Sequence, residues 1–230
     1  MCISNLDKNI RNSLNSDVAL ITQVSKYIID SGGKKLRPVL MFFFQKLISE
    51  SDSSLNEKVI RMASAIEFIH TATLLHDDVV DDSALRRNKK TANSLFGNAA
   101  SILVGDFLYS RAFQIMVSLE SKKIMQIMAD TTNKIAEGEV LQLMNCNDPE
   151  LKEDQYLKVI KFKTGKLFEA SCMIPAILAG STQSLINAAG NFGLHIGTAF
   201  QLTDDVLDYN GSEDEIGKKL GDDLREGKPT

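Results

Sequence analysis

The chain has 230 residues, of which 43% are hydrophobic and 24% charged, a composition typical of a globular protein with a sizeable core. Lysine and arginine number 26 against 30 aspartate and glutamate, which gives a formal net charge of −4. This balance supplies no overall positive field for nucleic acid or an anionic membrane surface. An anionic ligand therefore has to be bound by local groups of cations.

The cysteines and the N-terminus bear on the compartment. Cys2, Cys146 and Cys172 lie far apart and form no CxxC pair, which excludes a zinc finger or a disulfide scaffold and fits a reducing environment. The longest apolar run, Val39–Phe44, is too short for a transmembrane segment. The N-terminus lacks the cationic and hydrophobic blocks of a signal peptide, so we expect a cytoplasmic protein.

Helical spacing dominates the first half of the chain, and strand signals are weak. Arg37-Pro38 predicts the start of an apolar helix, because proline is favoured in the first helical turn. Ser54–Glu57 reads as a capping box that opens a long helix extending towards Asp82. Another long helix is expected over residues 98–119.

The second half shows the same periodicity. Long helices are expected over residues 122–143 and 184–209, and Asp148 followed by Pro149 predicts a further helix start. The residues from Asn210 onwards form a charged, glycine-containing tail that we expect to be irregular. The prediction is an all-α fold in one domain over residues 1–230.

Two aspartate clusters share one spacing. Asp77-Asp78-Val79-Val80-Asp81 is a DDxxD segment extended by Asp82, and Asp204-Asp205-Val206-Leu207-Asp208 repeats it. Each lies at the C-terminal end of a predicted helix. Carboxylates four residues apart repel one another and destabilise the helix, and the negative end of the helix dipole adds to this cost. A sequence that accepts these costs twice is expected to bind a cation there.

The residue types favour a hard cation. Carboxylates with no nearby cysteine and few histidines suit Mg²⁺ better than zinc, and the ligand pattern of an EF-hand is missing from the sequence. Magnesium is usually held by one or two carboxylates together with water and substrate phosphate. The paired clusters therefore predict a metal-bridged diphosphate. His70 and Gln201 precede the clusters at helical spacing, so both stripes are expected to line a cavity.

Groups of cations could bind that anion. Lys34, Lys35 and Arg37 surround the glycine pair Gly32-Gly33 and the start of a helix, and Arg86-Arg87 follows the first cluster. No P-loop motif occurs. Three lysines are interpreted as ordinary surface charges, and two histidines as structural residues: Lys35, Lys166 and Lys219, and His76 and His195.

Together these segments resemble the trans-isoprenyl diphosphate synthases, most closely the long-chain bacterial members. The resemblance is carried by GGKKLRP, EFIHTATLLHDDVVDDSALRR, the Lys163-Thr164 pair and FQLTDDVLDY followed by GKKLGDDLREGKPT. It implies an isoprenoid-synthase helical bundle around a deep apolar cavity, generally as a homodimer. It also implies head-to-tail condensation of isopentenyl diphosphate onto an allylic diphosphate such as farnesyl diphosphate, to make a long chain for a quinone side chain.

The resemblance also implies roles for individual residues. Magnesium is implied to bind at Asp77, Asp78 and Asp81 (with Asp82 in support) and at Asp204, Asp205 and Asp208. The isopentenyl diphosphate site is implied to contain Lys34, Arg37, His70 and Arg87. The allylic side is implied to contain Arg86, Lys163, Thr164, Gln201, Lys218 and Lys228, with Arg86, Lys163 and Thr164 closest to the reaction.

The resemblance bears on product length as well. Short-chain members place bulky aromatic residues just before the first cluster, where they form a floor for the growing chain. This chain has Ala72 and Thr73 there, so a long product is expected. The family's further C-terminal helices are not expected within residues 1–230.

Two other interpretations stay open at this point. A terpene cyclase would carry an Asn/Ser/Glu-type second motif in place of Asp204–Asp208 and would lack the GGKKLRP segment. A non-catalytic subunit of a heteromeric synthase would be expected to lose aspartates, and both clusters are complete here.

Overall fold

The computed structural model describes residues 2–49, 53–210 and 221–230. The chain forms two compact units, residues 1–121 and 122–230. The prediction of a single domain over residues 1–230 stays a prediction.

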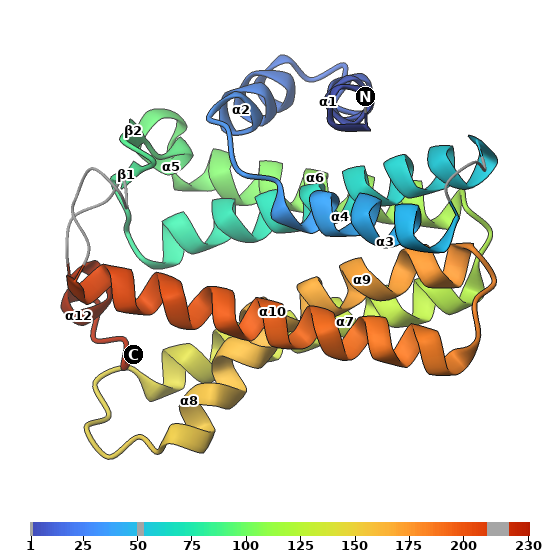
Figure 1. Ribbon diagram of the computed structural model, residues 1–230. Helices are drawn as coiled ribbons and strands as arrows, with labels where there is room; N and C mark the ends of the chain where they lie inside the picture. Colours follow the sequence, from blue (N-terminus) through green and yellow to red (C-terminus); the bar gives the residue numbers. More distant parts are fainter. Residues whose placement is uncertain (1, 50–52, 211–220) are drawn as a thin grey trace. The chain divides into compact units, whose positions relative to one another are not determined.

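The described residues of the first unit form helices, one small hairpin and the segments that connect them (Figure 1). Its elements are α1 (Cys2–Ser13), α2 (Ala19–Asp30), α3 (Leu36–Ile48), α4 (Ser53–Val80), β1 (Leu85–Arg86), β2 (Lys89–Lys90), α5 (Ala92–Phe96) and α6 (Asn98–Val117). Helix α4 is the centre of this unit and packs against α1, α3 and α6. Its side chains are buried on most sides, including Met62, Phe68 and Ile69, as expected for a helix that is covered by several others.

The second unit contains α7 (Lys122–Asn145), α8 (Glu153–Ile160), a single π-helical turn η1 (Lys161–Gly165), α9 (Lys166–Leu178), α10 (Gln183–Asn210) and α12 (Asp222–Arg225). Helices α8, η1 and α9 follow one another without an intervening loop. The η1 turn packs against both α7 and α10, and α9 packs along α10.

Glycines allow these close approaches in the second unit. A Cβ atom on Gly138 of α7 would lie 2.7 Å from the backbone nitrogen of Lys163. On α10, a Cβ on Gly193 would lie 2.5 Å from the carbonyl oxygen of Phe168, and one on Gly197 would lie 2.9 Å from the Cα of Gly165. The backbone of η1 is thus in direct contact with the helices on either side.

The predicted helix boundaries agree closely with most observed elements. The long helices expected near residues 54–82, 98–119, 122–143 and 184–209 correspond to α4, α6, α7 and α10. Helix α3 includes Arg37 and Pro38 in its first turn, and the expected capping box lies one residue inside the start of α4 at Ser53.

Other details were wrong. The helix expected from Asp148 begins instead at Glu153, where the backbone N–H of Lys152 donates to Gln155 Oε1 at 3.0 Å. Asp148 uses its side chain to accept the backbone N–H of Glu150 in a turn, at 3.0 Å. The tail contains the short helix α12, and the hairpin of β1 and β2 had no strand signal in the sequence.

Among the described residues, no helix is both long and apolar enough to span a membrane.

The close contact at Gly193 predicts that Gly193→Ala destabilises the protein by about 1–3 kcal/mol, because the added Cβ meets backbone atoms of α9 that cannot move aside alone. Helix propensity by itself would favour alanine by ~1 kcal/mol. The sign of the change in the free energy of unfolding therefore shows whether packing or helix propensity dominates at this position. Denaturant unfolding measures the difference. Asn191→Ala, at an exposed position of the same helix, should raise the free energy of unfolding by no more than ~0.7 kcal/mol, the difference in helix propensity.

Candidate active site

The first aspartate cluster terminates α4. The N–H of Asp82 donates to the carbonyl of Val79 at 3.3 Å, and the N–H of Ser83 donates to the carbonyl of Asp78 at 3.0 Å. Asp82 has φ +49°, so these bonds form the helix-ending motif that needs a left-handed residue. Asp77 and Asp81 lie one turn apart, with the N–H of Asp81 donating to the carbonyl of Asp77 at 2.8 Å.

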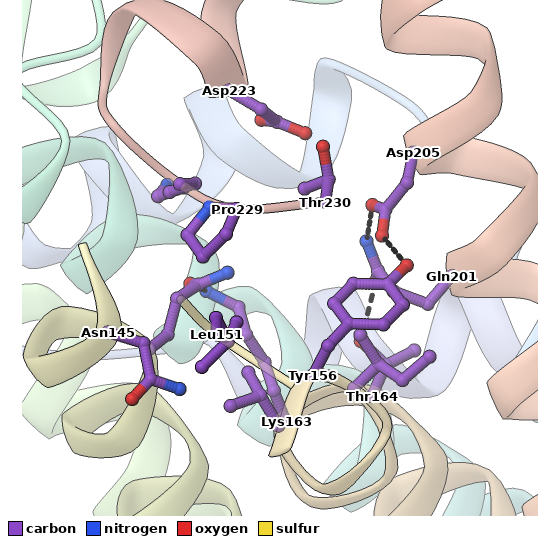
Figure 2. Close-up of a pocket in the computed structure, with 14 residues that line it drawn as sticks. Asn145, Leu151, Tyr156, Lys163, Thr164, Gln201, Asp205, Asp223, Pro229 and Thr230 are labelled. Atoms are coloured by element: carbon purple, nitrogen blue, oxygen red, sulfur yellow. Dashed lines mark hydrogen bonds between the residues drawn. The ribbon is translucent and has the colours of Figure 1, made fainter. Parts of the chain in front are cut away.

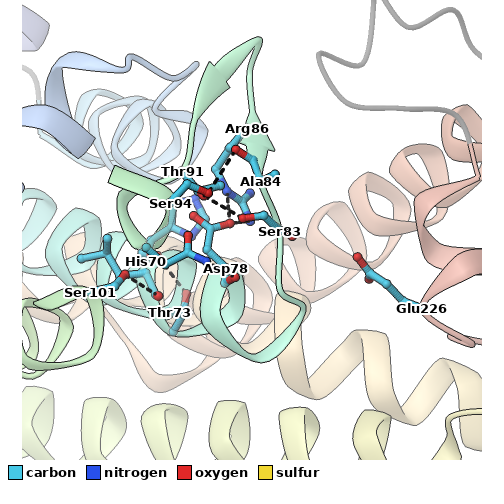
Figure 3. Close-up of polar contacts among 12 residues, drawn as sticks. His70, Thr73, Asp78, Ser83, Ala84, Arg86, Thr91, Ser94, Ser101 and Glu226 are labelled. Carbon is cyan, nitrogen blue, oxygen red and sulfur yellow. Dashed lines mark hydrogen bonds and ion pairs between the residues drawn. The ribbon is translucent and has the colours of Figure 1, made fainter. Parts of the chain in front are cut away.

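Asp78 is fully buried and bound inside the protein. Its Oδ1 accepts from Nε and Nη2 of Arg86, both at 2.8 Å, and its backbone carbonyl also accepts from the amide of Asn93 at 3.0 Å (Figure 3). Burial raises the pKa of Asp78, and the guanidinium of Arg86 partly offsets this. Asp78 therefore positions Arg86, and its predicted part in metal binding stays a prediction.

The hairpin after α4 carries both arginines. Arg86 ends β1, and the turn to β2 consists of Arg87 and Asn88, with φ +53° and +60°. Positive φ at both central residues is the two-residue hairpin turn that matches the twist of the strands. The turn therefore separates the two arginine side chains, and Arg86 pairs with Asp78.

Arg87 belongs to a second group of charges in this unit. Together with His70, Glu67 and Lys35 it lines a cavity of about 20 Å³. A Cβ on Gly33 would lie 2.9 Å from Nη1 of Arg87, so the glycine leaves room for the guanidinium. Lys35, interpreted from the sequence as a surface charge, is only partly exposed and pairs with Asp7.

Burial and charge act together on this group. Burial, together with the positive charges of Arg37, Arg86 and Arg87, lowers the pKa of His70 well below 6.5. Burial raises the pKa of Glu67, while Arg37 and Lys35 lower it. Of the four residues predicted to bind isopentenyl diphosphate, His70 and Arg87 line the cavity, the charge of Arg37 acts on His70, and Lys34 is exposed.

In the second unit, η1 places Lys163 and Thr164. A π-helical turn adds one residue to the helix and is often found at functional sites. The Lys163 ammonium donates to Glu139 Oε2 at 2.6 Å and to Gln142 Oε1 at 2.9 Å, both on α7. Two acceptors from a neighbouring helix hold this long side chain in place.

A chain of hydrogen bonds continues from Thr164 (Figure 2). The hydroxyl of Thr164 donates to Gln201 Oε1 at 2.7 Å, and Gln201 Nε2 donates to Asp205 Oδ1 at 2.8 Å. The hydroxyl of Tyr156 donates to Asp205 Oδ2 at 2.5 Å. Burial and the neighbouring carboxylate of Asp205 raise the pKa of Tyr156.

These side chains line one pocket of about 100 Å³ in the second unit. Of the residues predicted for the allylic side, this pocket brings together Lys163, Thr164, Gln201 and Lys228. Lys218 lies outside the described residues. Arg86 belongs to the first unit, where it pairs with Asp78.

The three aspartates of the second cluster have different surroundings. Asp204 is exposed, whereas Asp205 and Asp208 are 5% and 1% exposed. Asp208 Oδ2 accepts the backbone N–H of Asp223 at 3.2 Å, and its carbonyl accepts the N–H of Gly221 at 3.0 Å. Asp208 thus anchors the segment that carries Lys228 to the end of α10.

Within the described residues, no group of three or more histidine, cysteine, aspartate or glutamate side chains is arranged to hold a metal ion. Magnesium commonly uses one or two carboxylates and completes its shell with water and substrate phosphate. Asp77 and Asp81, one helical turn apart, fit such a partial site.

Sequence reasoning did not identify Tyr156, Glu139, Gln142 and Glu67. Tyr156 precedes Lys163 by seven residues, or two helical turns, which is a spacing that could have drawn attention to it. Glu139 and Gln142 carry no comparable signal, because only the packing of α7 on η1 brings them to Lys163.

Comparison with known proteins identifies the family. The family model described as polyprenyl synthetase matches residues 18–230. The chain belongs to this family. It is 52% identical over 221 residues to octaprenyl diphosphate synthase of Escherichia coli (strain K12), covering 96% of this chain and 67% of that protein. The Haemophilus influenzae enzyme of the same name is 53% identical over 225 residues, covering 98% and 67%.

A solved structure gives the same result for the fold. The crystal structure of a polyprenyl synthase from Caulobacter crescentus CB15, complexed with calcium and isoprenyl diphosphate, has a TM-score of 0.95 and 45% identity. The match covers 100% of this chain and 69% of that one. The predicted family, the all-α isoprenoid-synthase fold and the class of enzyme, a long-chain prenyltransferase, are confirmed. The terpene cyclase and the non-catalytic subunit are disfavoured.

The lowered pKa of His70 predicts a loss of stability in mild acid. Below 6.5 the unfolded chain binds a proton that the folded protein excludes, so the free energy of unfolding falls as pH decreases. The slope from this one group is at most ~1.4 kcal/mol per pH unit. Urea unfolding between pH 7.5 and 5.5 should show a shallower decline for His70→Gln than for the wild type.

His195→Gln is the matched control, because His195 lies at an exposed position of α10. It should keep the pH dependence of the wild type. Equal slopes for the wild type and His70→Gln would contradict the assignment of a neutral His70.

Proposed function

We propose that this chain synthesises octaprenyl diphosphate by repeated head-to-tail addition of isopentenyl diphosphate to farnesyl diphosphate. The observation that carries the proposal is the pocket of about 100 Å³ in the second unit. Four residues that the sequence assigned to the allylic side line it together: Lys163, Thr164, Gln201 and Lys228. The identity of 52–53% to octaprenyl diphosphate synthases supports the product class.

The allylic diphosphate is the leaving group, so charge grows on it as its C–O bond breaks. Cations fixed in advance lower the cost of that charge, and Lys163 is held by Glu139 and Gln142 before substrate arrives. Magnesium would neutralise the diphosphate further when bound at Asp77, Asp81 and Asp204. A metal role of this kind is supported by the calcium and isoprenyl diphosphate in the related Caulobacter structure.

Isopentenyl diphosphate keeps its diphosphate during the reaction, so its site has to bind that diphosphate without promoting cleavage of the C–O bond. Lys34, Arg37 and Arg87 supply positive charge, and a neutral His70 supplies a hydrogen bond without adding charge. The double bond of this substrate attacks the allylic carbon, and a proton is then lost. We assign that proton to the released diphosphate, which requires no dedicated protein base.

Product length is assigned to the residues just before the first cluster. Ala72 is fully buried within the first unit, whereas Thr73 is partly exposed and its hydroxyl donates to the carbonyl of His70 at 2.8 Å. Thr73 therefore presents its methyl group and little bulk. Of the two positions, Thr73 is the better candidate to contact a growing chain.

The proposal includes a single polyprenyl synthase domain over residues 1–230, a homodimer and a cytoplasmic location. It also includes a product used as a quinone side chain. The partial exposure of Cys146 as a free thiol is consistent with a reducing compartment.

The functional assay is incubation with labelled isopentenyl diphosphate, farnesyl diphosphate and magnesium, followed by chromatography of the dephosphorylated products. The wild type should make a C40 product, and chelation of the metal should stop it. Asp77→Ala and Asp204→Ala should each lower turnover at least ~100-fold. Their circular dichroism should be unchanged, because removing like charges from a helix end does not cost stability.

Asp130→Ala is the control, because Asp130 is an exposed carboxylate on α7 that accepts from Gln126 one turn away, at 3.0 Å. Its turnover should equal that of the wild type. Normal turnover of Asp77→Ala or Asp204→Ala in magnesium would contradict the metal assignment. Failure of the wild type to form product from both substrates would contradict the function.

The chain-length assignment predicts that Thr73→Tyr shortens the product towards C15 or C20 while condensation continues. A ring at a partly exposed position blocks the path of the chain, whereas Ala72→Tyr must also overpack the buried core at a cost of ~1–3 kcal/mol. Thin-layer chromatography compares the products. Thr73→Val removes the hydroxyl at nearly constant volume and should leave product length unchanged. Unshortened products from Thr73→Tyr would remove this residue from the tunnel.

A further inference from the structure

The short hydrogen bond of Tyr156 joins two elements of the second unit that are distant in sequence. Tyr156 lies on α8, and its hydroxyl donates to Asp205 Oδ2 on α10 at 2.5 Å. Asp205 is 5% exposed, and its other oxygen accepts from Gln201 at 2.8 Å. Figure 2 shows the ring of Tyr156 beside Asp205 and Gln201 at the edge of the pocket.

The chemistry of Asp205 determines the direction of the other hydrogen bonds. An ionised carboxylate only accepts, so the Gln201 amide has to turn its NH₂ group towards Asp205. Its Oε1 then faces Thr164, whose hydroxyl donates to it at 2.7 Å. One buried carboxylate therefore orients two polar side chains that line the pocket.

Asp205 needs its own support to perform this role. Its side chain has two rotatable bonds, and the contact to Gln201 lies within the same helix, so that contact does not tie Asp205 to another element. Tyr156 supplies a contact from a different helix. Its ring has few rotatable bonds, so it places the hydroxyl at little cost in entropy.

We propose that Tyr156 is a positioning residue for the allylic half of the site, acting through Asp205 on Gln201 and Thr164. This rests on the proposed function. Tyr156 does not perform chemistry itself; it fixes the orientation of polar groups that contact the allylic substrate. The hydroxyl carries this role, and the ring carries the packing of α8.

Tyr156→Phe separates the role of the hydroxyl from that of the ring, since it keeps the ring and removes one oxygen atom. Steady-state rates are measured with each substrate varied in turn. For farnesyl diphosphate, kcat/KM should fall by ~10–100-fold, as expected for losing a hydrogen bond to a charged group. The KM for isopentenyl diphosphate should stay within about twofold, because that substrate is assigned to residues of the first unit.

Tyr209→Phe is the matched control. Tyr209 lies near the end of α10, is 47% exposed, and accepts a hydrogen bond from Thr230 at 3.1 Å. It makes the same chemical change outside the chain of hydrogen bonds from Tyr156 through Asp205 and Gln201 to Thr164, so both substrates should give wild-type kinetics. An unchanged kcat/KM in Tyr156→Phe, or an equal loss for both substrates, would overturn the proposal.

A double-mutant cycle tests whether the hydroxyl acts through Asp205. Asp205→Asn is combined with Tyr156→Phe, and kcat/KM for farnesyl diphosphate is measured in all four proteins. If Tyr156 acts only through the carboxylate, the double variant is no slower than Asp205→Asn alone. If the losses in kcat/KM from the two substitutions multiply in the double variant, Tyr156 acts independently of Asp205, and this would contradict the inference.

Binding of inorganic diphosphate in magnesium, measured by calorimetry, separates this inference from the proposed function. If the wild type forms no product but Tyr156→Phe binds diphosphate ~10-fold more weakly, the octaprenyl assignment fails and the positioning role holds. If the wild type is active and Tyr156→Phe matches it in both binding and kinetics, the positioning role fails and the function holds.

Discussion

A buried carboxylate needs donors from the protein, and this requirement organises both aspartate clusters. In each cluster the second aspartate lies inside its unit, and in the second cluster Asp208 is buried as well. Asp78 is fully buried and takes two hydrogen bonds from Arg86, and Asp205 takes one each from Tyr156 and Gln201. Leaving such a charge unpaired would cost several kcal/mol, so these contacts are conditions for folding as well as for function.

The same requirement gives the aspartates within a cluster different roles. Asp78 and Asp205 are buried, whereas Asp77, Asp81 and Asp204 each retain solvent-accessible surface that a cation could approach. In the first cluster, Asp77 and Asp81 share one face of the helix and the buried Asp78 lies on another. In the second cluster, Asp204 and Asp208 share a face, although only Asp204 is exposed. A single motif thereby supplies both a structural anchor and candidate metal ligands.

Backbone packing sets the position of the reactive side chains in the second unit. Gly138 and Gly197 allow α7 and α10 to approach η1 closely enough that a Cβ would not fit. The extra residue of a π-helical turn rotates the following side chains relative to an ideal helix. Lys163 can then reach Glu139 and Gln142, and Thr164 can reach Gln201.

The sequence by itself determined the all-α class, the long helices and both aspartate clusters. These depend on local periodicity, and the DDxxD segments can be read directly from the chain. It also assigned Lys163, Thr164, Gln201 and Lys228 to one site through the family resemblance, and they line one pocket.

Only the tertiary structure decided which aspartates are buried, that Lys35 faces a cavity with His70, and that Tyr156, Glu139 and Gln142 support the site. Sequence spacing gives the face of a helix on which a residue lies, but not what packs against that face. The partners come from elements tens of residues away, and a hydrogen bond between them depends on packing within an ångström.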